Sequence, residues 1–328
     1  MTPCAPTTWK KLLEKAGQLP QEAMLLSEAT DESKRLRRTF DPAFPFEIHS
    51  FCFPDHKENL GTDWLNLHDY LELIIPSSGS GRFCMGDHEV QFEPGDLLIV
   101  ETMKLHGVTE TQGEHESIVI FFMPEFVFHP GSVLCDYEFL SPFFGRQGGE
   151  SPILRRDDPS AAGVHQALID LLDAYQKNFD ASTCKLRLLG VLNELRLNLG
   201  STAFTEVEYN QRQRSVDTIV PVIDHLREHF SESQSLPELA SMAGMSPTLF
   251  KSRFKAVTGS TFTQYRSHLR ISAAAHLLLE SDLSIGEVAH SVGFSDQSYF
   301  DRRFRERFRK TPREYRMNGA VRQPAEAV

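Results

Sequence analysis

The chain has 328 residues, a length that fits two domains of ordinary size. Hydrophobic residues make up 40% and charged residues 24%, with 24 Phe, which supplies enough apolar surface for a packed core and excludes global disorder. No apolar run approaches the ~20 residues that cross a bilayer, and no secretory signal is visible before Gly17, so we expect a cytoplasmic protein. Five cysteines stand far apart and never as C-x-x-C, which argues against a disulfide framework and a thiolate metal site.

The charge is distributed unevenly along the chain, whose net charge is −11. Between Ser215 and Ala320 there are 14 Lys or Arg against 12 Asp or Glu, whereas the remainder holds 20 against 33. The basic residues of this C-terminal part are bunched at 251–255 and at 302–310. An acidic front and a locally basic back indicate two functions on one chain.

The N-terminal part changes from polar sequence to short strands. Residues 1–40 are mostly polar and predict only one short helix around Trp9–Ala16, so we treat them as an N-terminal extension without assigned function. From Asp41 to about Phe128, alternating or apolar runs are broken by turn residues. Strands are expected at 71–75, 82–85, 89–93, 97–100 and 117–122, with turns at 77–81, 86–88 and 94–96. This spacing favours a β-sandwich or barrel over βαβ units.

After a loop at 141–150 the hydrophobic period becomes helical. One face carries Val164, Leu168, Leu171, Leu172 and Tyr175. A second stripe carries Leu186, Leu189, Leu192 and Leu195, widened by Leu188 and Val191. The two helices could cover their own domain or form a helical dimer interface, and the pattern leaves both open. Residues 201–214 are polar apart from Phe204 and form the candidate linker.

From Ser215 onward the pattern is helical, and the C-terminal part repeats itself. A buried stripe opens it: Val216, Ile219, Ile223, Leu226 and Phe230. Leu239-Ala240-x-x-Ala243-Gly244-Met245-Ser246 recurs 49 residues later as Val288-Ala289-x-x-Val292-Gly293-Phe294-Ser295. At an offset of 50 the pairs are Phe250/Phe300, Arg253/Arg303, Phe254/Phe304, Lys255/Arg305 and Tyr265/Tyr315. Each unit predicts a short helix, a turn at glycine, and a second helix capped by Ser246 or by Ser295-Asp296. This is the helix-turn-helix pattern, whose second helix enters the DNA major groove.

The residues that the second helices leave exposed are the candidate DNA contacts. Off the Phe250/Phe254 and Phe300/Phe304 faces lie the candidates for base contact: Thr248, Lys251, Ser252, Ser298, Tyr299 and Arg302. Lys255, Arg303 and Arg305 are better suited to phosphate, which positions a protein without specifying sequence. The alternative is a solvated basic helix face.

A long helix is predicted between the two units. It spans Phe262 to Glu280, with core positions expected at Tyr265, Leu269, Ala273, His276 and Leu277. Such a helix fixes the distance between the recognition helices, which should enter adjacent major grooves about 34 Å apart.

The second unit carries an extended motif. It reads Ile285-Gly286-Glu287-Val288-Ala289-x-x-Val292-Gly293-Phe294-Ser295-x-x-Ser298-Tyr299-Phe300-x-Arg302-x-Phe304 and ends in Thr311-Pro312-x-x-Tyr315-Arg316. The chain from Ser215 to Met317 therefore resembles the AraC/XylS-type transcription regulators. One position departs from that pattern: Arg309 stands where the family usually has Gly, although the first unit keeps Gly259. The resemblance implies a transcription regulator that binds double-stranded DNA as a homodimer, responds to a small-molecule effector and works with RNA polymerase. We expect an activator, although the sequence leaves activation and repression open.

The strand-rich part resembles the cupin-like sensor domain that many such regulators carry. The matching residues are Asn66-x-His68-x-x-x-Glu72, Gly79-x-Gly81, Pro94-Gly95-Asp96 and His106. We therefore expect an α+β two-domain protein, with a cupin-like β-barrel and trailing helices at 41–200 and an all-α domain with two helix-turn-helix motifs at 215–320. A small barrel often holds one small ligand. The candidate effector residues are Trp64, His68, Tyr70, Glu72, Phe83 and His106.

The chemistry of this sensor domain is less defined. Metal-binding cupins present His-x-His, and here the first of those positions is Asn66, which is a poor metal ligand. We therefore assign no metal, no other cofactor and no enzyme activity to this domain. Whether His68, Glu72 and His106 hold a metal stays open. The rival hypotheses are a cupin enzyme that uses a metal on these residues, and a docking surface for a regulatory protein. A sugar or another metabolite would fit a pocket with one Glu and two His.

Overall fold

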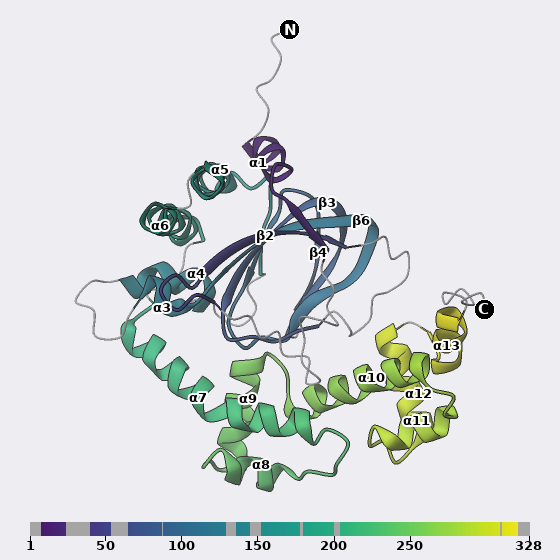
Figure 1. The fold of residues 1–328 in the computed structure, drawn as a ribbon. Helices are drawn as coiled ribbons and strands as arrows, with labels where there is room; N and C mark the ends of the chain where they lie inside the picture. The colour runs from purple at the N-terminus through teal and green to yellow at the C-terminus, as the bar shows by residue number, and fades with distance from the viewer. Residues whose placement is uncertain are drawn as a thin grey trace. The chain divides into compact units, whose positions relative to one another are not determined.

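The structure is a computed structural model that describes residues 8–23, 40–53, 65–86, 88–128, 136–144, 152–177, 180–199, 204–308 and 310–320. The chain forms two compact units, which divide between Arg214 and Ser215. The first contains a mostly antiparallel sheet with helices, and the second is helical, so the expected two-domain layout is confirmed (Figure 1). Among the described residues, no helix combines the length and the apolar character needed to span a membrane.

The sheet of the first unit has the order β1-β2-β6-β3-β5-β7, with β4 paired to β3. Its strands are β1 Gln21–Ala23, β2 Phe46–Phe53, β3 Leu71–Met85, β4 His88–Phe92, β5 Leu97–Val100, β6 His106–Phe122 and β7 Ile153–Leu154. The pairings are antiparallel except for β1 with β2, which is parallel. The described strands do not close on themselves, so the expected closed barrel is replaced by an open sheet.

The turn predicted at 77–81 is wrong, because β3 runs unbroken from Leu71 to Met85. Its register against β6 shifts between Pro76 and Ser78, between Ser78 and Ser80, and between Arg82 and Phe83. The glycines serve this irregular strand: Gly79 has φ 70°, and a Cβ on Gly81 would lie 2.1 Å from the Glu110 carbonyl oxygen. The small residues therefore mark bulges and close backbone approach inside a strand, not its end.

The longer helices of the first unit share one apolar core with the sheet (Figure 1). They are α1 Thr8–Ala16, α5 Ala161–Lys177 and α6 Ala181–Asn198. Leu12, Ala16 and Leu19, from the region assigned to an N-terminal extension, are buried in this core. The stripe predicted for α5 packs inward as expected.

The stripe predicted for α6 is partly wrong. Leu192 and Leu195 are buried, but Leu186 is 66% exposed and Leu189 is only half-buried. A step of three residues turns about 300°, so Leu186 and Leu195 lie about half a turn apart around the axis. The buried face follows Cys184, Leu188, Val191, Leu192 and Leu195 instead.

Short segments connect the sheet to the later helices. They are α3 Pro124–Val127, the 3-10 helix η2 Asp136–Leu140 and α4 Ser141–Phe144. Of the predicted linker 201–214, residues 201–203 lie outside the described part. Phe204 and Tyr209 are buried in the core of the first unit, and the chain is helical from Glu206, where α7 (Glu206–Glu228) begins.

The described residues of the second unit form six further helices. They are α8 Leu236–Met242, α9 Pro247–Thr258, α10 Phe262–Glu280, α11 Ile285–Ser291, α12 Gln297–Phe308 and α13 Pro312–Ala320. The predicted stripe of α7 is buried from Val216 to Leu226, and Phe230 packs half-buried against the core of α10 to α12. In α10 the prediction for His276 is wrong, because its side chain is half exposed. Ile271, Ala274, Ala275 and Leu278 take the core positions of that turn.

One buried histidine of the sheet is held neutral. His115 on β6 donates from Nδ1 to the Ser78 carbonyl at 3.2 Å and accepts at Nε2 from the Ser117 hydroxyl at 3.0 Å. Burial outweighs the hydrogen bond to Ser78 and lowers the pKa of His115 from 6.5 to about 4. The folded state therefore resists protonation of this ring.

We expect His115 to make the first unit acid-sensitive. As the pH falls below 6.5, His115 becomes protonated in the unfolded chain, whereas in the folded chain it stays neutral until about pH 4. The free energy of unfolding therefore decreases over this range. Between pH 7 and pH 5 the free energy of unfolding of the wild type should decrease by about 2 kcal/mol more than that of His115→Gln. Urea unfolding of both proteins at the two pH values measures this difference. Equal losses would contradict it.

Candidate nucleic-acid interface and sensor-domain cluster

The two helix-turn-helix units are built alike, as the repeat predicts. The first helix of each begins with a capping box, Ser235 with Glu238 in α8 and Ser284 with Glu287 in α11. Gly244 and Gly293 end these helices with φ values of 63° and 91°. This left-handed backbone suits glycine and reverses the chain.

The second helix of each unit is capped at equivalent positions. The Ser246 hydroxyl accepts from the Leu249 amide at the start of α9, and the Asp296 carboxylate accepts from the Tyr299 amide at 2.5 Å at the start of α12. These helices are fixed to the unit by phenylalanines that are fully buried: Phe250, Phe254, Phe300 and Phe304. The opposite face of each helix is therefore available to a partner.

The structure places the predicted DNA contacts on that outer face, with one exception. Exposed positions on α9 and α12 are Thr248, Lys251, Ser252, Lys255, Ser298, Tyr299, Arg302 and Arg305. Arg302 lies over the Tyr299 ring at 5.2 Å, and a pocket of about 590 Å³ beside it is lined by Asp301, Arg302, Arg305, Glu306 and Thr311. Two arginines and two carboxylates line this hollow, so its charges are balanced and the exposed arginines are the groups that can reach a phosphate outside it.

Arg303 is the exception, because it is partly engaged within the protein. It is half-buried, pairs with Glu306 at 2.5 Å, and its Nε lies 3.5 Å from the Ser267 hydroxyl. Its repeat partner Arg253 is also half-buried and donates to the Ser215 hydroxyl at 3.2 Å. This pair of arginines therefore holds each recognition helix to its neighbours. Arg309, the position that departs from the family pattern, lies outside the described residues.

Arg270, which no sequence motif singles out, holds two segments of the second unit together. From α10, its guanidinium donates to the carbonyl oxygens of Phe230 at 2.7 Å, Glu232 at 2.8 Å and Gly293 at 2.6 Å, with Ser231 at 3.3 Å. A cation that satisfies several backbone carbonyls orders both segments. The signal was weak, because an arginine on a long helix has no pattern that distinguishes it from a surface residue.

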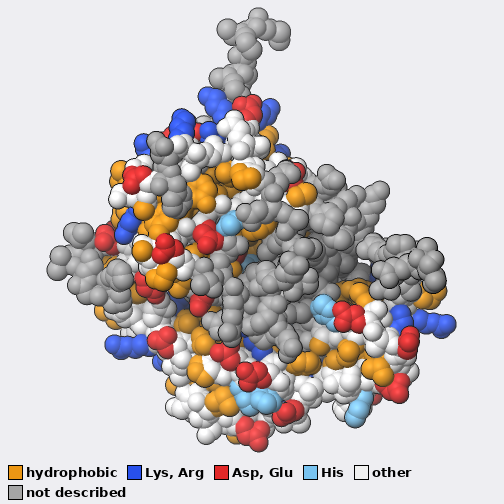
Figure 2. Space-filling model, in the orientation of Figure 1, with side chains coloured by type: hydrophobic (Ala, Val, Ile, Leu, Met, Phe, Trp, Pro, Cys, Tyr) orange, Lys and Arg blue, Asp and Glu red, His pale blue; other side chains and the backbone are white. Residues whose placement is uncertain are grey.

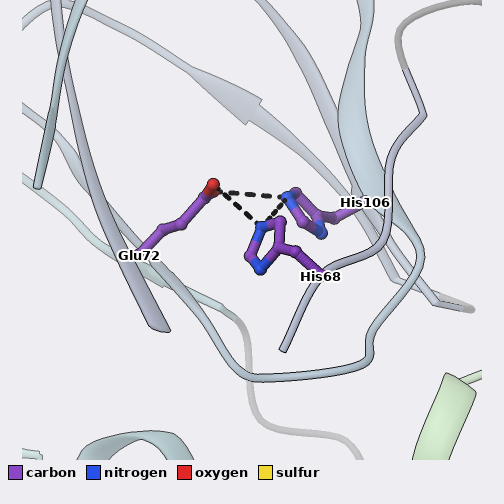
Figure 3. A group of neighbouring side chains, drawn as sticks. All are labelled: His68, Glu72 and His106. Carbon is purple, nitrogen blue, oxygen red and sulfur yellow. Dashed lines mark hydrogen bonds and ion pairs between the residues drawn. The ribbon is translucent and has the colours of Figure 1, made fainter. Parts of the chain in front are cut away.

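The sheet of the first unit brings three predicted residues together (Figure 3). His68 precedes β3, Glu72 lies on β3 and His106 begins β6. His68 Nε2 is 2.8 Å from one Glu72 oxygen, His106 Nε2 is 3.2 Å from the other, and the two Nε2 atoms are 3.2 Å apart. All three side chains are buried.

The charge state of this cluster follows from its surroundings. Burial would raise the pKa of Glu72, but the charges and hydrogen bonds of His68 and His106 outweigh it and hold that pKa well below its usual value. Burial lowers the pKa of His68 despite the attraction of Glu72. The carboxylate is therefore ionised.

The other candidate effector residues have mixed placements. Tyr70 stacks on His68 with ring centroids 3.7 Å apart, and Phe83 lies 6.1 Å from His106. Both rings are buried. Trp64 lies outside the described residues.

The face of the molecule drawn in Figure 2 mixes charge signs. Basic side chains gather over the region of α13, and acidic and histidine side chains over the C-terminal part of α7 (Figure 2).

Comparison with known proteins agrees with this geometry. The family model of a helix-turn-helix domain matches residues 239–318. The HTH-type transcriptional activator RhaS of Salmonella arizonae is 27% identical over 272 residues, covering 81% of this chain and 88% of that protein. RhaS of Yersinia pestis is 25% identical over 269 residues, covering 81% and 89%.

Solved structures also resemble the chain. ToxT from Vibrio cholerae is 13% identical with a TM-score of 0.42, covering 83% of this chain and 97% of that one. The DNA-binding domain of AdpA in complex with a target DNA is 32% identical with a TM-score of 0.32, covering 33% and 97%.

The sequence match covers both helix-turn-helix units, and the duplicated caps, glycine turns and buried phenylalanines lie where such units need them. The chain is a DNA-binding transcription regulator of the AraC family.

Proposed function

We propose that the protein activates transcription at specific promoter sites in response to a small-molecule effector bound by its N-terminal domain. The observation that carries the DNA-binding part is the pair of recognition helices with buried phenylalanines on one face and exposed polar and basic residues on the other. The RhaS relatives, named as transcriptional activators, support activation. The proposal places the protein in the cytoplasm, where its DNA lies.

The proposed division of labour follows from side-chain chemistry. Thr248, Lys251, Ser252, Ser298, Tyr299 and Arg302 contact bases, while Lys255, Arg303 and Arg305 contact phosphates. Arg303 pairs with Glu306 through Nη1, so in this proposal a phosphate is contacted by a guanidinium that is already partly engaged. Both helices are 12 residues long and are joined through α10, which suits adjacent major grooves about 34 Å apart.

Gel shifts with the full-length chain and its own upstream region test this function. We expect a discrete site bound at least ~10³-fold more tightly than random DNA, with affinity falling steeply as salt increases. If no fragment binds more tightly than random DNA, specific recognition is wrong.

Arg302→Ala separates base contact from phosphate contact. Because Arg302 is exposed on α12 and suited to guanine, its loss should weaken the target site by about 1–3 kcal/mol while leaving random DNA little changed. Lys255→Ala should weaken both DNAs alike and reduce the salt slope by about 1. Arg313→Ala, an exposed arginine on α13, is the matched control and should change neither. If the ratio of the affinities for the target site and for random DNA is unchanged in Arg302→Ala, Arg302 does not contact bases.

The first unit supplies the effector-binding function in this proposal. His68, Tyr70, Glu72, Phe83 and His106 form a buried polar and aromatic group on one sheet, and Trp64 is proposed with them from sequence. The protein acts as a homodimer with RNA polymerase as its partner and is a regulator, not an enzyme. A thermal-shift screen of metabolites tests the effector, because a ligand of the native state raises its melting temperature.

A further inference from the structure

Two histidines lie one helical turn apart at the carboxyl end of α7. His225 and His229 have the i, i+4 spacing at which helical zinc sites hold two imidazoles on one face. Their ring centroids are 4.5 Å apart with an interplanar angle of 40°, and both residues are partly exposed. An ion from solvent can therefore reach both rings at once.

Glu232 determines which nitrogen His229 presents. His229 Nδ1 lies 3.0 Å from a Glu232 carboxylate oxygen. An ionised carboxylate only accepts, so Nδ1 carries the proton, and Nε2 of the neutral ring holds a lone pair. The same pairing of a carboxylate with histidine orients the ligands of metal sites in other proteins. His229 is therefore oriented as a metal ligand.

The backbone that carries these side chains is held by hydrogen bonds. The His229 amide donates to the His225 carbonyl at 3.0 Å, and the Glu232 amide donates to the His229 carbonyl at 3.1 Å. Gln234 Nε2 also donates to the His229 carbonyl, at 2.9 Å. Arg270 donates to the Glu232 carbonyl at 2.8 Å. Because this backbone is already ordered, little conformational freedom is lost when an ion binds.

The separation of the two rings fits two ligands of one ion. A histidine nitrogen lies about 2.0–2.1 Å from a bound metal, which places the centroid of its ring about 3.2 Å from the ion. Two centroids 4.5 Å apart then subtend about 90° at the ion. Adjacent ligands at a right angle are typical of the tetragonal coordination that Ni²⁺ and Cu²⁺ adopt with nitrogen ligands.

The alternative is that each histidine interacts only with the carboxyl end of the helix dipole. That role needs a positive charge on each ring, and two imidazolium rings at this separation repel one another. A shared cation instead attracts the lone pairs of both neutral rings and the carboxylate beside them. The observed pairing therefore favours an ion over two separate charges.

We propose that His225 and His229 together bind one divalent first-row transition-metal ion, with Ni²⁺ or Cu²⁺ as the best geometric fit, and that Glu232 positions His229. The site lies in the helical unit, and its residues belong neither to the candidate effector group nor to the candidate DNA contacts. Its assays need no DNA and no effector, so it can fail without affecting the proposed function.

Hydrogen exchange of the full-length, chelator-treated chain during a Ni²⁺ titration tests the site. The amides of His229 and Glu232 donate within the turn that the ion would hold closed. Since the ion binds only the closed turn, their exchange should slow about 100-fold at a Ni²⁺ concentration 100 times the dissociation constant. An ion bound elsewhere in the chain leaves this local signal unchanged. Exchange at these amides that Ni²⁺ does not slow would overturn the proposal.

Variants locate the ion and test the role of Glu232. His225→Gln and His229→Gln should each lower the Ni²⁺ affinity at least ~100-fold, because each removes a ligand and even outer-shell changes cost about 10–100-fold. Glu232→Ala should lower the affinity about 10-fold. Glu232→Gln keeps an oxygen that accepts from His229 Nδ1 and should recover part of that loss. Equal affinities in Glu232→Ala and the wild type would contradict the positioning role.

His276→Gln is the matched control. His276 lies 3.9 Å from Glu280 on α10, and the residues four positions away from it are Ser272 and Glu280, not a second histidine. Its Ni²⁺ affinity at the end of α7 should therefore equal that of the wild type. Circular dichroism verifies that each variant is folded. If Ni²⁺ still slows exchange at the end of α7 in folded His225→Gln and His229→Gln, these histidines do not bind the ion.

Discussion

Replacing Gly293 by Ala is expected to destabilise the second helix-turn-helix unit by about 4 kcal/mol. Gly293 has φ 91°, where a side chain costs about 1–2 kcal/mol. A Cβ there would also lie 2.2 Å from the Ser231 carbonyl oxygen and 2.9 Å from the Arg270 guanidinium carbon. The backbone must shift to relieve this contact, and such shifts account for unusually large effects of single substitutions.

Gly244→Ala is the matched control for this prediction. Gly244 occupies the same turn of the first unit with φ 63°, but a Cβ there meets no atom within 4 Å. It should therefore cost only the backbone strain, about 1 kcal/mol. Amide hydrogen exchange in α8–α9 and α11–α12 of the full chain measures each unit separately. Equal losses of protection in the two variants would show that the contact with Ser231 has no energetic weight.

The helical unit could be predicted from sequence because its signals are local. The repeat fixes the caps at Ser246 and Asp296, the turns at Gly244 and Gly293, and the phenylalanine faces, and all of them lie as predicted. Each depends on residues within about one helical turn. The prediction fails for His276, where a neighbouring core position is filled by Ala275 and the histidine is left half exposed.

The sheet was harder to predict because its features depend on pairing across long distances. The glycine-rich run at 77–81 predicts a turn, yet pairing with β6 carries it through as a bulged strand. The open sheet likewise cannot be told from a barrel by strand spacing alone. His68, Glu72 and His106 were grouped by resemblance. The hydrogen bonds that orient the two rings, from His68 to the Tyr70 carbonyl and from His106 to the Lys104 carbonyl, arise only when the chain folds.

The difference between the two glycine turns is likewise invisible in the repeat, because it comes from the segment after α7. That segment lies against the second turn, where Arg270 donates to the carbonyls of Phe230, Glu232 and Gly293. The two units are similar in sequence, but the glycine turn of each has different contacts with the rest of the protein. The second turn is held by Arg270 of α10, which donates to the Gly293 carbonyl. At the first turn, a Cβ added to Gly244 has no described atom within 4 Å.

Arg270→Ala is accordingly expected to lower the stability of the second unit by about 3–5 kcal/mol. Hydrogen bonds from a charged donor are worth about 1.5–3 kcal/mol each, and this guanidinium serves several carbonyls at once. Arg266→Ala is the control on the same helix, because Arg266 donates once, to the Gln234 carbonyl at 3.0 Å, and should cost about 1–2 kcal/mol. Hydrogen exchange in α11 and α12 should report the loss.

A double-mutant cycle that combines Arg270→Ala with Gly293→Ala tests whether these two residues are energetically coupled. Since the added Cβ and the guanidinium meet the same Ser231 segment, the combined loss should fall short of the sum by at least ~1 kcal/mol. Additive losses would mean that Arg270 and Gly293 act independently. In that case the orientation of α12 would depend on its buried Phe300 and Phe304 and on the contact of Arg303 with Ser267, and not on the contacts of Arg270.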